Sequence, residues 1–283
     1  MKRLWSAAPT LSTFLVVALP LSVPCVLSVT DAHAAGRPAP AVRSVGQVPG
    51  HPLVLYPGRE GTAAAYCPQG MKPTGGGATV ESDLRSAVFF RKSAPDAAGN
   101  RWVVQAYNAS DEVQTVHPRV ICTTDGSITQ RPEADVPLQP GESVHSTASC
   151  GNARYAVGGG FEAGSRTFVS ISDSPDIRSW SAMAKYTDYS PDAPPSYLRT
   201  FVVCSDTEPV WKAGTTATLA VGEVGMATAE CPAGQVPLSG GGAGSLDVLL
   251  TTSAPTATGW TVWAKNTGFD PHTLFASVMC AVP

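Results

Sequence analysis

The chain has 283 residues, of which 14% are charged and 43% are hydrophobic, and its formal net charge is −3. The few charged residues form no basic run. This argues against nucleic acid or an anionic membrane as a partner, because both are bound through clustered Lys and Arg.

The first 34 residues are typical of a secretory signal peptide. Lys2 and Arg3 form a charged head, residues 11–29 are mostly apolar, and Ala32-His33-Ala34 offers a small-x-small cleavage site. Cleavage near Ala34 would give a secreted mature chain with six cysteines and no membrane span. Residues 35–51 are rich in Ala, Gly, Pro and Val, and we expect them to form a flexible leader.

Three copies of one repeat fill the rest of the chain, and we expect them over residues 52–124, 135–206 and 216–283, with linkers over 123–134 and 205–214. Each copy has a leucine, a glycine, a cysteine, a glycine triplet, a proline, a tryptophan and a second cysteine, in that order. These landmarks are Leu55, Gly58, Cys67, Gly75–Gly77, Pro95, Trp102 and Cys122; Leu138, Gly141, Cys150, Gly158–Gly160, Pro175, Trp180 and Cys204; Leu219, Gly222, Cys231, Gly240–Gly242, Pro255, Trp260 and Cys280.

The segments between these landmarks predict strands. In the first copy a short strand opens the repeat at residues 53–55, and another precedes the proline at 86–91. The tryptophan segment 102–107 alternates with period two, as a half-buried strand does, and 119–122 is rich in β-branched residues. The other copies follow the same pattern, and no mature segment keeps a helical period. The chain is therefore predicted to be all-β, with three homologous antiparallel units.

An even number of cysteines in an exported chain favours disulfides over metal ligands or a free nucleophile. Six cysteines allow 15 pairings, but the repeat makes one bond per copy the natural choice. We therefore predict Cys67–Cys122, Cys150–Cys204 and Cys231–Cys280, which are separated by 55, 54 and 49 residues. In the chain-entropy model each such loop stabilises the fold by roughly 4 kcal/mol.

The glycine triplets are not predicted to bind phosphate, because no lysine and no helical pattern follows them. Glycine within a strand more often allows close approach of a backbone or a large ring. We expect each triplet to lie beneath the tryptophan of its own repeat.

The sequence contains no catalytic motif, no metal-binding motif and no cofactor-binding motif. We therefore expect the protein to have no catalytic activity and to bind no metal or cofactor. His51, His117, His145 and His272 occupy different places in the repeats and lack partners in any known motif. Asp173 and Asp176 flank Ser174-Pro175 and are better explained by a turn than by acid–base chemistry. A hydrolase or a protease inhibitor remains the least favoured alternative.

Aromatic residues outside the shared framework are the better candidates for a binding site. We predict three binding residues, Trp263, Tyr107 and Tyr186, because exposed rings beside polar groups stack on sugars or anchor proteins. Trp263 and Tyr107 should project from the strand face opposite the tryptophan. Tyr186 shares the parity of Trp180, and is chosen because it replaces the Asn of the other copies. Alternatively, these rings cover the second sheet face or fill contacts between repeats.

The repeat resembles one found in secreted actinobacterial proteins and at the ends of phage-tail-like and collagen-like bacterial proteins. The likeness rests on Cys67-Pro68-Gln69-Gly70, the triple glycine, Ser93-Ala94-Pro95, Trp102 and Asn108, with counterparts from Cys231 to Asn266. It spans residues 52–283 and brings no catalytic residue. The middle copy departs from it, with Gly151-Asn152-Ala153 after Cys150 and Tyr186 for the Asn.

A fainter likeness is to the vitelline membrane outer layer protein, a β-prism of three Greek-key sheets with Cys-Pro-x-Gly repeats. The repeats of that protein are shorter, and its closing motif is not present here. The likeness implies a pseudo-threefold prism and a carbohydrate-related role. The repeats could instead be separate beads, but short linkers favour packing.

For function, the sequence favours a secreted, non-enzymatic binding or adhesion protein for a cell-surface glycan or a protein partner. The main alternative is a structural or assembly component of the cell envelope or of an extracellular particle.

Overall fold

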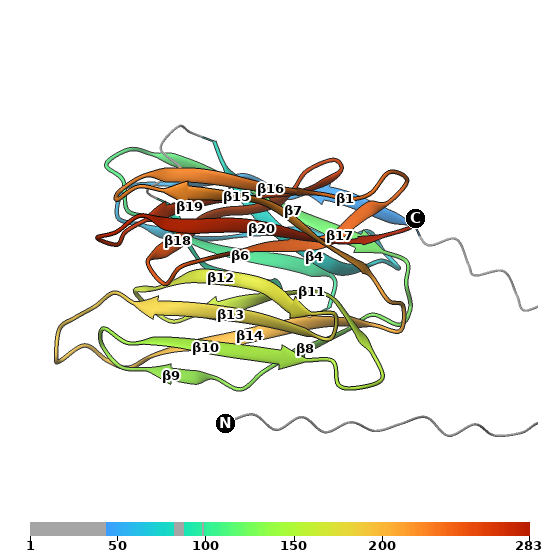
Figure 1. The fold of residues 1–283 in the computed structure, drawn as a ribbon, viewed down its shortest axis with the longest axis horizontal. Helices are drawn as coiled ribbons and strands as arrows, with labels where there is room; N and C mark the ends of the chain where they lie inside the picture. The colour runs from blue at the N-terminus through green and yellow to red at the C-terminus, as the bar shows by residue number, and fades with distance from the viewer. Residues whose placement is uncertain (1–43, 82–87, 98) are drawn as a thin grey trace, which may run out of the picture. The chain divides into compact units, whose positions relative to one another are not determined.

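The computed structural model describes residues 44–81, 88–97 and 99–283, and all regular structure in this part of the chain is β-strand (Figure 1). The predicted signal peptide and most of the predicted leader lie outside the described residues. None of the described segments forms a helix that is long and apolar enough to cross a bilayer.

The strands fall into three similar series, which we call repeats 1, 2 and 3. Repeat 1 contains β1 (Val45–Pro49), β2 (Leu53–Leu55), β3 (Glu60–Tyr66), β4 (Lys72–Val80), β5 (Val88–Pro95), β6 (Arg101–Asn108) and β7 (Gln114–Thr123). Repeat 2 contains β8 (Thr129–Pro132), β9 (Val136–Leu138), β10 (Ser143–Ser149), β11 (Tyr155–Ala163), β12 (Thr167–Asp176), β13 (Ser179–Tyr186) and β14 (Ser196–Ser205). Repeat 3 contains β15 (Val210–Leu219), β16 (Val224–Glu230), β17 (Val236–Gly244), β18 (Val248–Pro255), β19 (Gly259–Asn266) and β20 (His272–Ala281).

Three antiparallel sheets are formed, and each takes strands from two repeats. Sheet A has the order β1-β7-β4-β18-β19-β16, with β2 also paired to β7. Sheet B has the order β3-β6-β5-β11-β14-β8, with β9 paired to β14, and sheet C has the order β10-β13-β12-β17-β20-β15. The neighbours β10, β13 and β12 can be followed in Figure 1. Every repeat thus divides its strands between two sheets.

This exchange closes the molecule into a three-sheet, prism-like arrangement. Repeats 1 and 2 meet where β5 pairs with β11, repeats 2 and 3 where β12 pairs with β17, and repeats 3 and 1 where β18 pairs with β4. We call these contacts junctions 1–2, 2–3 and 3–1. Because the cycle is complete, the repeats are packed together and are not separate beads.

All three predicted disulfides are present, one in each repeat. Cys67 directly follows β3 of sheet B, whereas Cys122 lies in β7 of sheet A. The same relation holds for the other two bonds. Each disulfide therefore links two sheets of the prism within one repeat.

The three tryptophans are buried, as predicted, and each is 1% exposed. Each indole Nε1 donates a hydrogen bond to a serine of the same repeat, with N–O distances of 3.0, 3.1 and 2.9 Å for Ser93, Ser172 and Ser253. A Cβ at Gly76, Gly159 or Gly240 would overlap Trp102, Trp180 or Trp260 respectively. The prediction that glycine lies beneath each tryptophan is confirmed.

The glycine that follows each of these allows two repeats to approach closely at a junction. A Cβ at Gly77, Gly160 or Gly241 would overlap the carbonyl group of Ser253, Ser93 or Ser172 of the neighbouring repeat. These are the serines that accept the indole hydrogen bonds. One short motif therefore fixes both the tryptophan and the contact between repeats.

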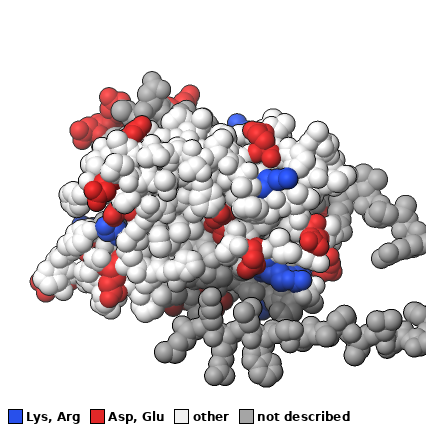
Figure 2. Space-filling view, in the orientation of Figure 1, with Lys and Arg blue, Asp and Glu red and all other residues white. Residues whose placement is uncertain are grey.

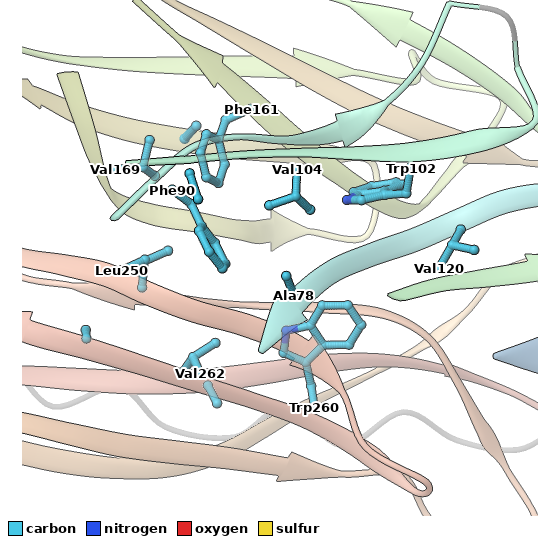
Figure 3. Packing of buried hydrophobic residues seen from close by; sticks show 14 of the residues in the cluster. Ala78, Phe90, Trp102, Val104, Val120, Phe161, Val169, Leu250, Trp260 and Val262 are labelled. Atoms are coloured by element: carbon cyan, nitrogen blue, oxygen red, sulfur yellow. The ribbon is translucent and has the colours of Figure 1, made fainter. Parts of the chain in front are cut away.

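The core lies where the three sheets face one another. Phe90, Val169 and Leu250 occupy equivalent positions, next to the irregularity in their strands, and lie together in the interior with Phe161 (Figure 3). The preceding residues Phe89, Phe168 and Leu249 form a second, smaller cluster. Equivalent residues of three repeats can touch only near the pseudo-threefold axis, so this second cluster lies at the axis.

Three details of the repeat differ from the prediction. Strand β1 lies within the expected leader, and β8 and the start of β15 lie within the expected linkers, because these segments pair their backbones with the cysteine strands β7, β14 and β20. Their sequences show too little apolar alternation to predict this. In the second copy Ser174, not Pro175, occupies the place of Pro95 and Pro255, because Ser172 is the partner of Trp180.

Candidate binding site at the junction of repeats 1 and 2

Tyr107 lies on the outer side of β6, opposite the inward-facing Trp102, as predicted. It is paired across the strands with Glu60 on one side and Phe89 on the other. Its ring centroid lies 6.2 Å from that of Phe168, and Phe89 and Phe168 are 5.1 Å apart. The ring is therefore half-buried against the axial cluster and keeps part of its surface free.

A groove with a volume of about 480 Å³ opens beside this ring. We call it the Tyr107 groove. It is lined by Gly58, Glu60, Tyr107, Ser165, Arg166, Phe168 and Thr187. Its volume falls within the range of small-ligand sites, and its lining combines aromatic rings with hydroxyl, carboxylate and guanidinium groups.

Arg91 holds one wall of the groove from behind. It lies at an irregularity of β5, between Phe90 and Lys92, and is only 7% exposed. Its Nε donates to the carbonyl oxygen of Gly164 at 3.0 Å, and its Nη1 pairs with the carboxylate of Glu60. A buried arginine needs such partners, since an unpaired buried charge is costly. Arg91 thereby fixes Glu60 against repeat 2.

Arg166 also lines the groove and lies in the turn between β11 and β12. It is the one non-glycine residue with a positive φ in the described part of the chain, at 53°. Its carbonyl oxygen accepts from the backbone N and from Oγ1 of Thr187, both at 2.9 Å, and its guanidinium pairs with Asp188. A left-handed conformation costs an arginine roughly 1 kcal/mol, and strained residues of this kind cluster at functional sites.

The same place at junction 2–3 is filled differently. Strand pairing makes Lys185 the equivalent of Tyr107, and the turn position of Arg166 is taken by Asp247. Lys185 Nζ and Asp247 form an ion pair across this junction, and the hydrogen bond that Lys185 donates to Asp247 raises the pKa of Lys185. Ser143 and Ser170 stand in place of Glu60 and Arg91. The corresponding segment at junction 3–1 includes residues 82–87, which lie outside the described residues.

The charges of the Tyr107 groove are compensated in pairs. Glu60 is matched by Arg91 and Arg166 by Asp188. On the face shown in Figure 2, Lys and Arg side chains are few and separated, with no basic patch. The groove therefore suits an uncharged ligand with hydroxyl groups, which can bond both carboxylate and guanidinium partners.

Trp263 lies elsewhere, on the outer side of sheet A. It projects opposite Trp260, as predicted, and pairs across β16 with Met226, which is 46% exposed. Trp263 belongs to β19 of sheet A and Tyr107 to β6 of sheet B, and Trp263 is not among the residues that line the Tyr107 groove. Its equivalents are Gln105 and Met183, so this aromatic position also differs between copies.

Tyr186 is not a surface residue, and its choice as a binding residue is wrong. It is 2% exposed, and its hydroxyl donates to the carbonyl oxygen of Pro194 at 2.9 Å. In repeat 1 the side-chain amide of Asn108 instead donates a hydrogen bond to the carbonyl oxygen of Glu112, and in repeat 3 that of Asn266 donates to Asp270. Both acceptors lie two residues before the next strand. The loop of repeat 2 is longer, so a longer side chain spans it. Tyrosine replaces asparagine here for a structural reason.

The histidines stay separate. His117 Nε2 lies 3.1 Å from Glu81, His145 is exposed on β10, and His272 lies beside Gly268. Among the described residues, no group of three or more His, Cys, Asp or Glu is arranged to hold a metal ion.

Sequence reasoning missed Glu60, Arg91 and Arg166. A signal for them exists: each is charged where the second or third repeat has a neutral or oppositely charged residue. It could be used only with an alignment of the copies at single-residue accuracy, which the unequal lengths of the segments before Val88 and Thr167 prevent.

No known protein family matches the sequence, and no curated protein matches it. The resemblance of the repeat to secreted actinobacterial proteins therefore stays a prediction.

Proposed function

We propose that this chain is a secreted, non-enzymatic binding protein that holds an uncharged cell-surface glycan in the Tyr107 groove. Three disulfides fit an oxidising compartment such as the cell exterior. The observation that carries the proposal is the convergence of Glu60, Arg91, Tyr107 and Arg166 at one junction of a pseudo-symmetric fold.

Symmetry gives this observation its weight. Residues that all three repeats share are explained by packing, cross-linking or backbone conformation. The four residues at the groove are not shared, and Ser143, Ser170, Lys185 and Asp247 show that the junction forms without them. A prism junction can therefore form without an aromatic ring, a buried arginine and a strained arginine at this place, and a ligand site would account for their presence.

The chemistry of the groove favours binding over hydrolysis. A sugar presents apolar ring faces to an aromatic side chain and hydroxyl groups to planar polar groups. Glycoside hydrolysis ordinarily needs two carboxyl groups beside the scissile bond. Among the lining residues only Glu60 carries one, and it is paired with Arg91.

The direct test replaces the groove residues by those of junction 2–3. The double variant Tyr107→Lys/Arg166→Asp should close the groove with an ion pair. We expect binding to a glycan array to be lost while the protein stays folded, which chemical denaturation of the variant checks. The matched control, Lys185→Ala at junction 2–3, should keep binding.

Trp263→Ala separates this site from the other aromatic candidate. Loss of binding in Trp263→Ala, with full binding in the groove variant, would place the site on sheet A and overturn the proposal. A wild-type protein that binds no glycan on the array would also contradict it, and would favour a protein partner or a role in envelope assembly.

A further inference from the structure

A second hollow lies on the same outer face as the Tyr107 groove, at the other end of β3 and β6. The outward residues of these two strands pair as Glu60–Tyr107, Thr62–Gln105, Ala64–Val103 and Tyr66–Arg101. One end of this row borders the Tyr107 groove. The other end borders a hollow of about 380 Å³, lined by His51, Pro52, Leu53, Thr62, Ala63, Ala64, Tyr66, Arg101 and Val103. We call it the Tyr66 hollow.

Tyr66 is exposed, and Arg101 fixes its position. It is 51% exposed, and the guanidinium of Arg101 lies over its ring, 5.6 Å from the centroid. Arg101 Nη1 donates to the Tyr66 hydroxyl at 2.9 Å, and its Nε donates to Asp96 at 2.7 Å. A ring fixed in this way loses little conformational entropy on binding, which favours affinity.

The other copies lack this second aromatic group. The positions of Tyr66 and Arg101 are taken by Ser149 and Ser179 in repeat 2 and by Glu230 and Gly259 in repeat 3. The Tyr66 hollow therefore belongs to the same repeat as Glu60, Arg91 and Tyr107, and its residues are likewise not part of the shared framework.

The two ends are too far apart for one sugar. From Arg101 to Tyr107 the strand advances six residues, or about 20 Å at a rise of about 3.4 Å per residue. Between them lie the side chains of Thr62 and Gln105, a hydroxyl and an amide. Arg101 is matched by Asp96, so this end of the row is compensated in charge like the groove.

We infer that the outer face of β3 and β6 binds an uncharged, linear polysaccharide, which spans from the Tyr107 groove to Tyr66. This inference rests on the proposed function and adds the class of ligand: a chain of several sugars whose hydroxyl groups meet Thr62 and Gln105 between two aromatic contacts. A short saccharide fills one end only, so affinity grows with chain length.

The experiment measures affinity by isothermal titration for two series of uncharged β-1,4-linked oligosaccharides, of N-acetylglucosamine and of glucose, from the monosaccharide to the hexamer. We expect affinity in one of the series to rise with length up to the span of the row. Tyr66→Ala should weaken hexamer binding about tenfold and leave disaccharide binding unchanged. Tyr66→Phe, which keeps the ring, should bind the hexamer nearly as the wild type does.

Controls separate this inference from the proposed function. Phe269 is 96% exposed in repeat 3, and Phe269→Ala should leave all affinities unchanged. Equal affinity for the disaccharide and the hexamer, with no effect of Tyr66→Ala, would overturn the extended site and leave the groove intact. Absence of binding in both series would overturn the inference, while the glycan array still tests the groove on its own. Thermal unfolding of each variant shows that the fold is retained.

Discussion

Junctions 1–2 and 2–3 have the same frame but different polar residues. At both, a tryptophan bonds a serine whose carbonyl group approaches a glycine of the next repeat, Ser93 with Gly160 and Ser172 with Gly241. Around this frame junction 1–2 has Tyr107 and Arg166, whereas junction 2–3 has Lys185 and Asp247. The difference shows which positions build the prism and which are free to take on a function.

The largest expected effect concerns the frame itself. Trp102→Ala and Trp180→Ala each remove a buried indole and leave a cavity, so each should lower the free energy of unfolding by about 3–5 kcal/mol. Because the two tryptophans have equivalent surroundings, the two losses should agree within about 1 kcal/mol. Chemical denaturation measures both. A much smaller loss at Trp180 would show that the frames of the two junctions are not energetically equivalent.

A buried carboxyl group distinguishes junction 2–3 and carries the next effect. Asp173 is 6% exposed and accepts a hydrogen bond from Ser277, where repeats 1 and 3 have Ala94 and Ala254. Burial raises the pKa of Asp173 to about 6 from its ordinary 3.8, although the bonds from Ser277 and the Ser174 backbone act in the opposite direction. A difference of about 2 in pKa corresponds to roughly 3 kcal/mol.

The pH dependence follows from the sign of this shift. Since the folded pKa is higher than the unfolded one, the stability from the protonated form is complete below about pH 4 and is lost as pH rises through about 6. Asp173→Asn keeps an acceptor for Ser277 and removes the charge. It should stabilise the protein by up to about 3 kcal/mol at pH 8, with little gain at pH 4.

Junction 1–2 supplies the matched control for this effect. Ala94 is fully buried at the equivalent position, so Ala94→Asp should destabilise the protein at pH 8 more than at pH 4. Urea unfolding at several pH values measures both variants. Equal stability of Asp173→Asn and the wild type across this range would show that Asp173 does not titrate near 6 in the folded state.

The shared frame of the junctions could be predicted from the sequence because its residue pattern occurs in all three repeats. The cysteine pairs, the buried tryptophans and the glycine beneath each of them follow from spacing and alternation, and the structure confirms them. The exchange of strands between sheets could not be predicted. A strand with alternating residues shows which face is buried, but not which neighbour it pairs with.

The candidate site was predictable only in part. The outward position of Tyr107 follows from its parity, which places it opposite Trp102. The prediction for Tyr186 is wrong because this tyrosine spans a longer loop than Asn108 and Asn266 do. Only the hydrogen bond from its hydroxyl to the carbonyl of Pro194 shows this reason. Arg91 was missed because an irregularity in β5 disturbs the alternation at that residue. A difference between copies therefore indicates function only after loop length and irregular pairing are accounted for.

The smallest expected effect tests whether the ion pair at junction 2–3 belongs to the frame. The side chains of Lys185 and Asp247 are 21% and 26% exposed, so solvent screens part of their attraction. Lys185→Ala should lower the free energy of unfolding by only about 0.5 kcal/mol at low salt, and by less at high salt, because a partly exposed pair contributes little and is screened.

Lys265 occupies the corresponding position in repeat 3, so Lys265→Ala gives the background for losing a lysine stem there. Thermal unfolding at two salt concentrations compares the two variants. A loss above about 2 kcal/mol for Lys185→Ala alone would mean that the pair holds the junction together, since screened surface pairs do not reach this size. Tyr107 and Arg166 would then have to replace that stabilisation at junction 1–2, and their divergence would need no ligand to explain it. A small, salt-sensitive loss of unfolding free energy would mean that this position contributes little to stability. The equivalent residue in repeat 1, Tyr107, is then free to serve in ligand binding.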